Sequence, residues 1–307
     1  MKIGITTVSN VLEEWTYKDL QDLKEALTEA GSEAKMIYAD SLDMELSGSG
    51  ITPFQSGERA SGASKGRERI DVDGVLLRHL GTIRDYEQLT YRLFCIKAFE
   101  ELGIPVMNPV IPWLFATDKF GALMKLSAKG IPVPETVVTE HMFVGYSALK
   151  RLGPSVIKPL RSAMGFGIFK VDDPDVGMHA FSYLTNMNKP IYIQKFLEKK
   201  GFGDYRVVVV GGNVEGAEFR KGITWKSNVA QGATPKKAKP DEELKELAVK
   251  SCEILGLDYA GIDVASTDEG YFVLETNPTL SWQGFRKATG INPAESIANL
   301  ILSRAHR

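Results

Sequence analysis

The order of apolar and amphipathic stretches over the first 110 residues most constrains what this chain can fold into. An apolar run at 2–8 (KIGITTV) leads to an amphipathic stretch near 18–30, and further apolar runs follow as EAKMIYA, DGVLLRHL and IPVMN. A second amphipathic stretch, near 87–102, precedes the last of these runs. Strands that alternate with helices of this length indicate a parallel sheet covered by helices. The sequence therefore predicts an α/β domain over residues 1–110.

After residue 110 the pattern changes to short strands with hairpin signals, such as SVIKPL with GIFKV and YRVVVVGG with NVEGAEFRKG. Helices are expected near 241–255 and 293–305, with the strand pair YAGIDVAST and YFVLETN between them. Antiparallel sheets with helices packed on one side fit this pattern. We therefore predict two α+β lobes, at 111–190 and 191–307. The fold class is α/β followed by α+β.

One stretch of the first domain, residues 46–69, is rich in glycine and serine. This composition predicts a mobile, solvated loop. The stretch carries four cations, which are Arg59, Lys65, Arg67 and Arg69.

The charge and composition of the chain limit its partners. A formal net charge of −2 gives no overall attraction to nucleic acid or to an anionic membrane, so an anion site must be built from locally placed cations. No apolar run approaches the ~18 residues that a membrane helix needs, and the first residues do not resemble a signal peptide. Cys95 and Cys252 lie far apart in expected helices, which favours free thiols. We expect a cytoplasmic protein that binds neither nucleic acid nor membrane.

The apolar strand YFVLETN carries two polar side chains, Glu275 and Asn277, on one face, where burial is costly unless something satisfies them. A three-residue loop (DEG) before this strand would pair Thr267 with Tyr271. In that register Asp263 lies opposite Glu275, where like charges destabilise the pair. A cation would relieve this repulsion, and Mg²⁺ prefers a few carboxylate oxygens together with phosphates. The alternative is a strand end whose acids are solvated.

The stretch VIKPLRSAMGFGIFKV offers the cation and the backbone amides that a phosphate group needs. Lys158 ends one strand, and Gly165 and Gly167 lie in the loop before the next strand. Glycines let backbone N–H groups turn toward an anion. The stretch is not a Walker loop, because no Gly-Lys-Ser/Thr follows and its flanks are strands. A plain turn is the alternative.

Further charged residues stand at the ends of expected elements. Lys119 opens a helix behind Asp118, a candidate N-cap, and the alternative for Lys119 is a surface lysine. Asp204 and Arg206 alternate on one strand face, and Arg220 ends the next strand. Arginine offers a rigid multi-donor fork to carboxylate or phosphate oxygens. Each of the three could equally be a solvated edge residue, so the combination carries the prediction.

These motifs, in this order, resemble the ATP-grasp superfamily and, within it, the RimK-like amino-acid ligases. The resemblance covers most of residues 70–292 and includes VIKPLRSAMGFGIFKV, IQKFLEKKGFGDYRVVVVGG, WKSN, GIDVAS and FVLETN. Through LLRHLGTIRDYEQLTYRLFCIKAFEELGIPVMN the chain most resembles the ligases that add glutamate to coenzyme tails in methanogens. The resemblance implies a three-lobed fold whose second and third lobes clasp ATP.

The resemblance also implies a role for each candidate site residue. The ATP phosphates would be held by Lys119 and Lys158, under a closing loop that contains Gly165 and Gly167. The hinge that lines the adenine would be formed by Gln194, Lys195, Phe196, Leu197 and Glu198, with Glu198 near the ribose. Asp204 and Lys226 would also touch the nucleotide. Two Mg²⁺ ions, with Mn²⁺ as an alternative, would be bound by Asp263, Glu275 and Asn277. The carboxylate being activated would face Arg206, Arg220 and Asn228.

The expected activity is the ATP-dependent joining of a carboxylate to an amine. The substrate carboxylate would attack the ATP γ-phosphate to give an acylphosphate and ADP, and an amine would then displace phosphate. We expect the amine to be an amino acid, glutamate first, and the carboxylate to belong to a coenzyme, peptide or protein tail. The alternative is an ATP-binding regulatory protein that keeps the cleft but does not ligate. A homo-oligomer is also expected.

One feature qualifies the resemblance, and another excludes a different class of enzyme. The chain reads NPTLSWQGFRKATG after the expected metal strand, and Trp282 and Gln283 stand where selectivity for the amino acid is expected. A dehydrogenase with a dinucleotide-binding first domain is excluded, because no glycine fingerprint follows KIGITTV.

Overall fold

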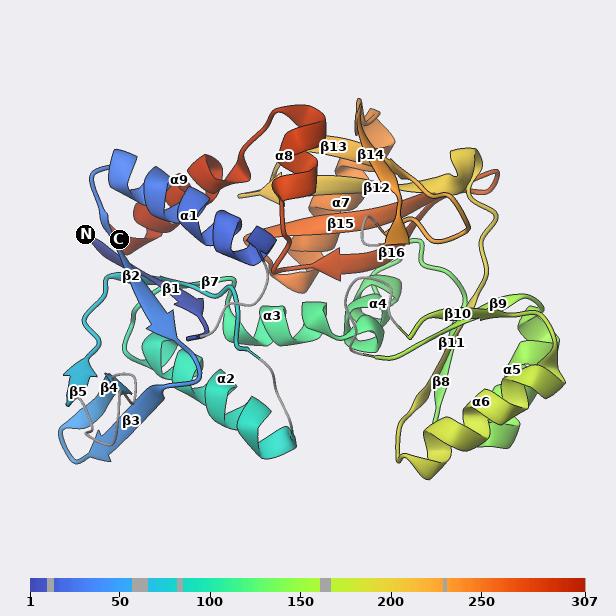
Figure 1. Ribbon diagram of the computed structural model, residues 1–307, viewed down its shortest axis with the longest axis horizontal. Helices are drawn as coiled ribbons and strands as arrows, with labels where there is room; N and C mark the ends of the chain where they lie inside the picture. Colours follow the sequence, from blue (N-terminus) through green and yellow to red (C-terminus); the bar gives the residue numbers. More distant parts are fainter. Residues whose placement is uncertain (10–13, 57–65, 82–84, 161–166, 229–230, 307) are drawn as a thin grey trace.

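The computed structural model describes residues 1–9, 14–56, 66–81, 85–160, 167–228 and 231–306. The strands in this part of the chain form four sheets. The chain runs from the blue N-terminal sheet, through the green and yellow central sheet, to the orange C-terminal sheet (Figure 1). The central and C-terminal sheets lie next to each other (Figure 1).

The N-terminal sheet is parallel, with the strand order β2-β1-β6-β7. Its strands are β1 (Lys2–Thr7), β2 (Glu33–Tyr38), β6 (Gly74–Leu76) and β7 (Val106–Met107). Helix α1 (Glu14–Glu29) covers one face of the sheet, and α2 (Tyr86–Glu101) covers the other. The α/β arrangement predicted for the start of the chain is confirmed.

The packing of this sheet follows from its apolar periodicity. On β1, Ile3 and Ile5 lie two residues apart, so they share one face, and both are fully buried. They pack with Leu20, Leu23 and Leu27 of α1, whose spacing of three and four residues forms one helix stripe. The same stripe explains why α1 lies flat on the sheet.

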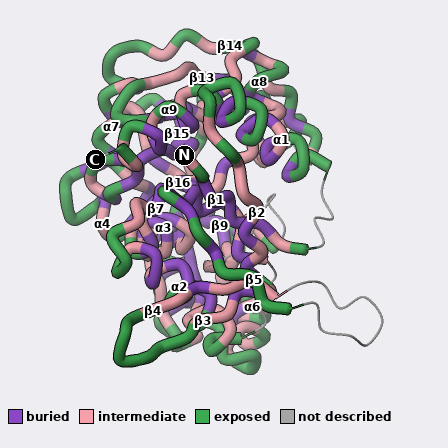
Figure 2. The backbone as a smooth tube through the Cα atoms, turned by 90° about the vertical axis from the view of Figure 1, so that its left-hand side faces the viewer, coloured by how far each residue is buried: buried purple, intermediate pink, exposed green. Residues whose placement is uncertain are grey.

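Part of the stretch predicted to be a mobile loop is instead a small antiparallel sheet. Its strands are β3 (Leu42–Ser47), β4 (Gly50–Ser56) and β5 (Arg67–Arg69), in that order. The prediction was wrong because Gly- and Ser-rich composition hides specific pairs: Arg67 is ion-paired with Glu45 over 2.6 Å and lies over the ring of Phe54. The turn between β3 and β4 is exposed (Figure 2). Arg59 and Lys65 lie outside the described residues.

The central sheet is antiparallel, with the order β10-β9-β11-β8. Its strands are β8 (Thr136–Thr139), β9 (Ser155–Lys158), β10 (Phe169–Val171) and β11 (Ile191–Lys195). Helices α5 (Met142–Leu152) and α6 (Pro174–Asn186) pack side by side against it. Two short helices, α3 (Val110–Thr117) and α4 (Lys119–Ser127), lead into the sheet from the first domain (Figure 1). The predicted domain boundary at 190 falls just before β11 and stays a prediction.

The C-terminal sheet is antiparallel, with the order β14-β13-β12-β15-β16. Its strands are β12 (Gly203–Val210), β13 (Asn213–Lys221), β14 (Thr234–Ala238), β15 (Tyr259–Thr267) and β16 (Gly270–Asn277), preceded by the short helix η1 (Lys200–Phe202). Helix α7 (Glu242–Leu255) covers one face. Helices α8 (Gln283–Thr289) and α9 (Pro293–Ala305) lie on the other, together with α1. None of the helices in the described ranges has the length and apolarity needed to cross a membrane.

The C-terminal part of the chain is tied to the first domain at a buried residue. Asn108, which follows β7, is fully buried and donates to the carbonyls of Tyr259 and Pro278. Its side-chain oxygen accepts from the N–H groups of Asp258 and Tyr259, over 2.7 and 3.1 Å. Both polar atoms of its side chain are therefore used across this contact, which fixes the start of β15 against the first domain.

Candidate active site

The hairpin that carries the acidic pair has a different register from the predicted one. Thr267 pairs with Gly270 across a tight turn, so the predicted pairing of Thr267 with Tyr271 is wrong. A β-bulge next to Asp263 then shifts the register by one residue. The two deviations cancel, and Asp263 pairs directly with Glu275 as predicted.

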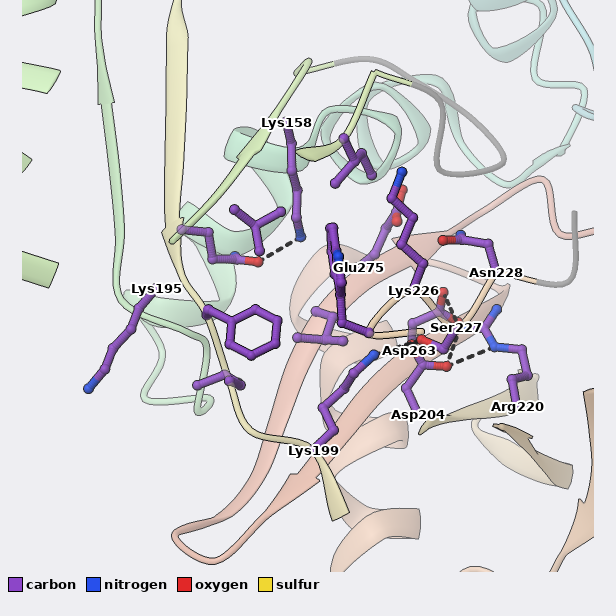
Figure 3. A pocket seen from close by; sticks show the side chains of 17 residues that line it. Lys158, Lys195, Lys199, Asp204, Arg220, Lys226, Ser227, Asn228, Asp263 and Glu275 are labelled. Carbon is purple, nitrogen blue, oxygen red and sulfur yellow. Dashed lines mark hydrogen bonds and ion pairs between the residues drawn. The ribbon is translucent and has the colours of Figure 1, made fainter. Parts of the chain in front are cut away.

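A pocket opens between the central and C-terminal sheets (Figure 3). Predicted site residues among its lining are Lys158, Gln194, Lys195, Phe196, Leu197, Asp204, Arg220, Lys226, Asn228, Asp263 and Glu275. They come from β9, β11, β12, β13, β15 and β16 and from the segments after β11 and β13, so residues far apart in sequence meet here. Lys195 is exposed, and its amine points away from the other labelled side chains.

Two arginines hold Asp263 at the floor of this pocket. Arg206 donates from Nε and Nη2 to the two carboxylate oxygens of Asp263, over 2.8 and 3.0 Å. Arg220 lies 2.9 Å from Asp263 and 2.8 Å from Asp204, and so bridges the two acids. Burial alone would raise the pKa of Asp263, but the charges of Arg206 and Arg220 outweigh it and lower this pKa to about 2. Asp263 is therefore ionised at neutral pH.

Asp204 connects this cluster to the segment after β13. Its second oxygen accepts from the hydroxyl of Ser227 and lies 3.7 Å from the amine of Lys199. Lys199 in turn donates to Ser227 over 2.8 Å. Both residues line the pocket, as does Trp225, whose ring meets Phe196 edge-on at 6.0 Å.

Two lysines, Lys119, which is buried, and Lys158, which is half-buried, lie near Glu275. Lys119 begins α4, where Asp118 accepts from the N–H of Gly121 over 2.8 Å, as expected of an N-cap. Its amine lies 3.1 Å from Glu275. Lys158 donates to the side-chain oxygen of Gln194 over 2.6 Å. Site residues are thus brought together from both lobes.

Lys158 is expected to make nucleotide binding dependent on pH. Burial lowers the pKa of its amine to about 8, and Glu275 opposes this only in part. Because phosphate binds the protonated amine, ADP affinity should fall by up to about tenfold per pH unit above this pKa. Calorimetric titrations from about pH 7 to about pH 9.5 test the trend. Lys158→Arg keeps its proton throughout this range, so its profile should be flatter; parallel profiles would contradict the prediction.

The acidic pair fits a magnesium site. Asp263 and Glu275 present carboxylates from neighbouring strands, and Asn277 supplies an amide next to Gly261 on the same strand pair. Within the described ranges no group of three or more His, Cys, Asp or Glu gathers to hold a metal. Phosphate oxygens and water would therefore complete the shell, as is typical of Mg²⁺. Asp263 is already in the ionised form that a metal requires.

Some predicted residues lie outside the pocket lining, and some lining residues were not predicted. Arg206 stands behind Asp263, and Glu198 is exposed. Gly165 lies outside the described residues, whereas Gly167 has φ 72° and precedes the lining residue Ile168. The functional candidates that sequence reasoning missed are Lys199, Trp225 and Ser227. Their position in the sequence was the available signal, because Lys199 follows the predicted hinge and both Trp225 and Ser227 lie within WKSN.

Trp282 and Gln283, expected where amino-acid selectivity is set, do not line this pocket. Trp282 is fully buried, and its indole N–H donates to Asp22 of α1 over 2.9 Å. The Gln283 amide donates to Asp19 and Asp22, each over 2.9 Å. Arg78 lies over the Trp282 ring, 4.5 Å from its centre. These contacts join the C-terminal lobe to the first domain.

Comparison with known proteins agrees with this geometry. A family model described as the RimK-like ATP-grasp domain matches residues 116–301. This chain belongs to that family. The RimK-like chain is 31% identical over 261 residues to the tetrahydromethanopterin:alpha-L-glutamate ligase of Methanosarcina acetivorans, covering 75% of this chain and 80% of the relative. It is 28% identical over 305 residues to a probable alpha-L-glutamate ligase of Aliivibrio fischeri, covering 98% and 95%.

Solved structures share the fold. The ATP-grasp ligase PsnB, complexed with minimal precursor, Mg and ADP, has a TM-score of 0.72 at 20% identity, covering 99% of this chain and 98% of that chain. The predicted ATP-grasp fold and family are thereby confirmed. The RimK-like protein is an ATP-dependent ligase that forms C–N bonds, and ligases of this kind bind ATP and magnesium.

Proposed function

We propose that this RimK-like ligase activates a substrate carboxylate as an acylphosphate and joins it to an amino acid, glutamate, on a coenzyme, peptide or protein tail. The observation that carries this proposal is that Lys158 lines the same pocket as Asp263 and Glu275, while the amine of Lys119 lies 3.1 Å from Glu275. Cations opposite a pair of acidic side chains suit a nucleotide whose phosphates carry a metal. Glutamate is supported by the names of the relatives.

The adenine would lie at the hinge after β11. The N–H groups of Lys195 and Phe196 already donate to the carbonyls of Glu135 and Pro154. Among the described residues the N–H of Leu197 has no such backbone partner, so it is the hinge donor we assign to the base. The aromatic rings of Phe196 and Trp225 wall this end of the pocket.

The chemistry then depends on positioning and charge. A carboxylate oxygen of the acceptor attacks the γ-phosphorus, and the bond to the β-phosphate oxygen breaks to release ADP. Lys158 and Lys119 would neutralise the phosphate oxygens, and magnesium, when bound by Asp263, Glu275 and Asn277, would supply Lewis-acid stabilisation of the transferred group. We assign two ions to this set, with Mn²⁺ as the substitute.

The second half of the reaction forms the amide. The neutral amine of the amino acid attacks the acyl carbon, the tetrahedral oxyanion collapses, and inorganic phosphate leaves while the nitrogen loses a proton. Arg220 would donate to the oxyanion, with Asn228 beside it and Arg206 behind. A pocket closed to water would protect the acylphosphate from hydrolysis.

Release of ADP that requires both substrates tests this function. Purified protein with Mg·ATP is screened with glutamate and other amino acids against coenzyme, peptide and protein tails, and products are weighed by mass spectrometry. A product heavier by one amino-acid residue, formed with ADP, is the expected result. Nucleotide-induced thermal stabilisation without ADP release for any pair would instead favour an ATP-binding regulatory protein. Light scattering of the same preparation tests the predicted homo-oligomer.

A further inference from the structure

A row of charged side chains crosses the C-terminal sheet behind the pocket. In register, Glu218 on β13 pairs with Arg206 on β12, and Arg206 pairs with Asp263 on β15. Asp263 pairs in turn with Glu275 on β16. Arg206 therefore has an acidic neighbour on each side. It donates two hydrogen bonds to one of them, Asp263. In the described part of the chain it forms no ion pair with the other, Glu218.

Glu218 is a buried acid with one oxygen that lacks a hydrogen-bond donor among the described residues. Its residue is only 2% exposed, and its Oε2 atom is buried without a hydrogen-bond partner in the described part of the chain. Burial raises the pKa of this carboxyl, against the opposing charges of Arg206 and Arg220. A buried carboxyl oxygen that lacks a donor is destabilising. The position therefore suits a donor that arrives in another state of the enzyme.

For Asp263 the situation is reversed, because several groups compete for its two carboxylate oxygens. Its two oxygens receive N–H groups from both Arg206 and Arg220, and under the proposed function they also bind magnesium. A divalent cation there repels both guanidinium groups and competes for the same lone pairs. Arg220 keeps a second acceptor, Asp204, at 2.8 Å. Among the described residues Arg206 has no second ion-pair partner, and Glu218 is the acid next to it.

We propose that Glu218 is a positioning residue that accepts the Arg206 guanidinium when magnesium and nucleotide enter the pocket, so that Asp263 is released to the metal. The inference rests on the proposed metal role of Asp263. Directly paired residues have Cβ atoms about 4.5–5.5 Å apart, so rotation of one long side chain is enough to exchange partners. The exchange keeps Arg206 paired in both states and gives the buried Glu218 oxygen its donor.

The gain in ADP affinity that magnesium produces measures this exchange. Calorimetry compares ADP binding with MgCl₂ and with EDTA in three variants. Glu218→Leu removes the acceptor, Glu218→Gln keeps one acceptor oxygen, and Glu215→Gln makes a matched change on the same strand outside the row. Loss of an outer-shell partner typically costs metal affinity about 10–100-fold, so Glu218→Leu should reduce the magnesium gain at least about tenfold. Glu218→Gln should retain most of it, and Glu215→Gln all of it.

An undiminished magnesium gain in folded Glu218→Leu overturns the exchange while leaving the metal site standing. An equal loss in the Leu and Gln variants also overturns it, because acceptor chemistry would then not matter. If Asp263→Asn keeps the full gain, the metal role itself fails, and the inference falls with it. A crystal structure of the Mg·ADP complex decides the matter even if Glu218→Leu does not fold. Arg206 within about 3.2 Å of Glu218 supports the exchange, and Arg206 still bidentate on Asp263 refutes it.

Discussion

Glu275→Gln is expected to lower the rate of ADP formation by about 10²–10³-fold, the loss typical of removing one group that stabilises transition-state charge. Two effects act together. The variant removes a negative metal ligand, and it removes the charge that raises the pKa of Lys158, so less of that amine stays protonated. The measurement is the initial rate of ADP release with saturating Mg·ATP, acceptor and amino acid.

The fold should survive this substitution. The Glu275 side chain is 30% exposed, and a glutamine oxygen can still accept from Lys119, whose amine lies 3.1 Å away. We expect the free energy of unfolding to change by about 1 kcal/mol. Glu269→Gln, in the exposed turn of the same hairpin, is the matched control and should keep wild-type turnover. Near-normal turnover in Glu275→Gln would remove the residue from the metal site.

The sequence was most informative where local pattern and long-range pairing agree. Strands alternating with helices predicted the parallel first sheet, and hairpin signals predicted the antiparallel sheets that follow. The opposition of Asp263 and Glu275 was also predicted, but through compensating errors. A turn shorter than expected moved the pairing by one residue, and a β-bulge moved it back. Bulges depend on how a whole sheet twists, so a single hairpin sequence does not reveal them.

Contacts between domains were the least predictable part. Trp282 and Gln283 follow the metal strand, and the sequence places them near the site, yet their partners Asp19 and Asp22 lie in α1, near the start of the chain. No local periodicity encodes such a contact. The composition of residues 46–69 likewise favoured a loop, although cross-strand pairs such as Arg67 with Glu45 make parts of it strands. Tertiary packing overrides composition in both cases.

Arg220→Ala is expected to abolish ligation and to lower the free energy of unfolding by about 3–5 kcal/mol, because it leaves two buried acids without their shared cation. The Arg220 side chain is 3% exposed and lies 2.8 Å from Asp204 and 2.9 Å from Asp263. Burial alone would lower the pKa of Arg220, but these two carboxylates outweigh it and raise the pKa above its ordinary value, so the cation is permanent. Chemical denaturation and ADP-release rates measure the two losses separately.

Arg220→Lys separates charge from geometry. An ammonium group restores one positive charge between Asp204 and Asp263 but lacks the planar fork, so stability should recover in part while ligation stays low. ADP binding to folded Arg220→Lys should stay near that of the wild type, because Lys119 and Lys158 hold the phosphates in the proposed arrangement. If ADP affinity fell as far as ligation, Arg220 would be a phosphate ligand rather than the oxyanion donor. Recovery of ligation with the lysine would show that charge alone suffices there.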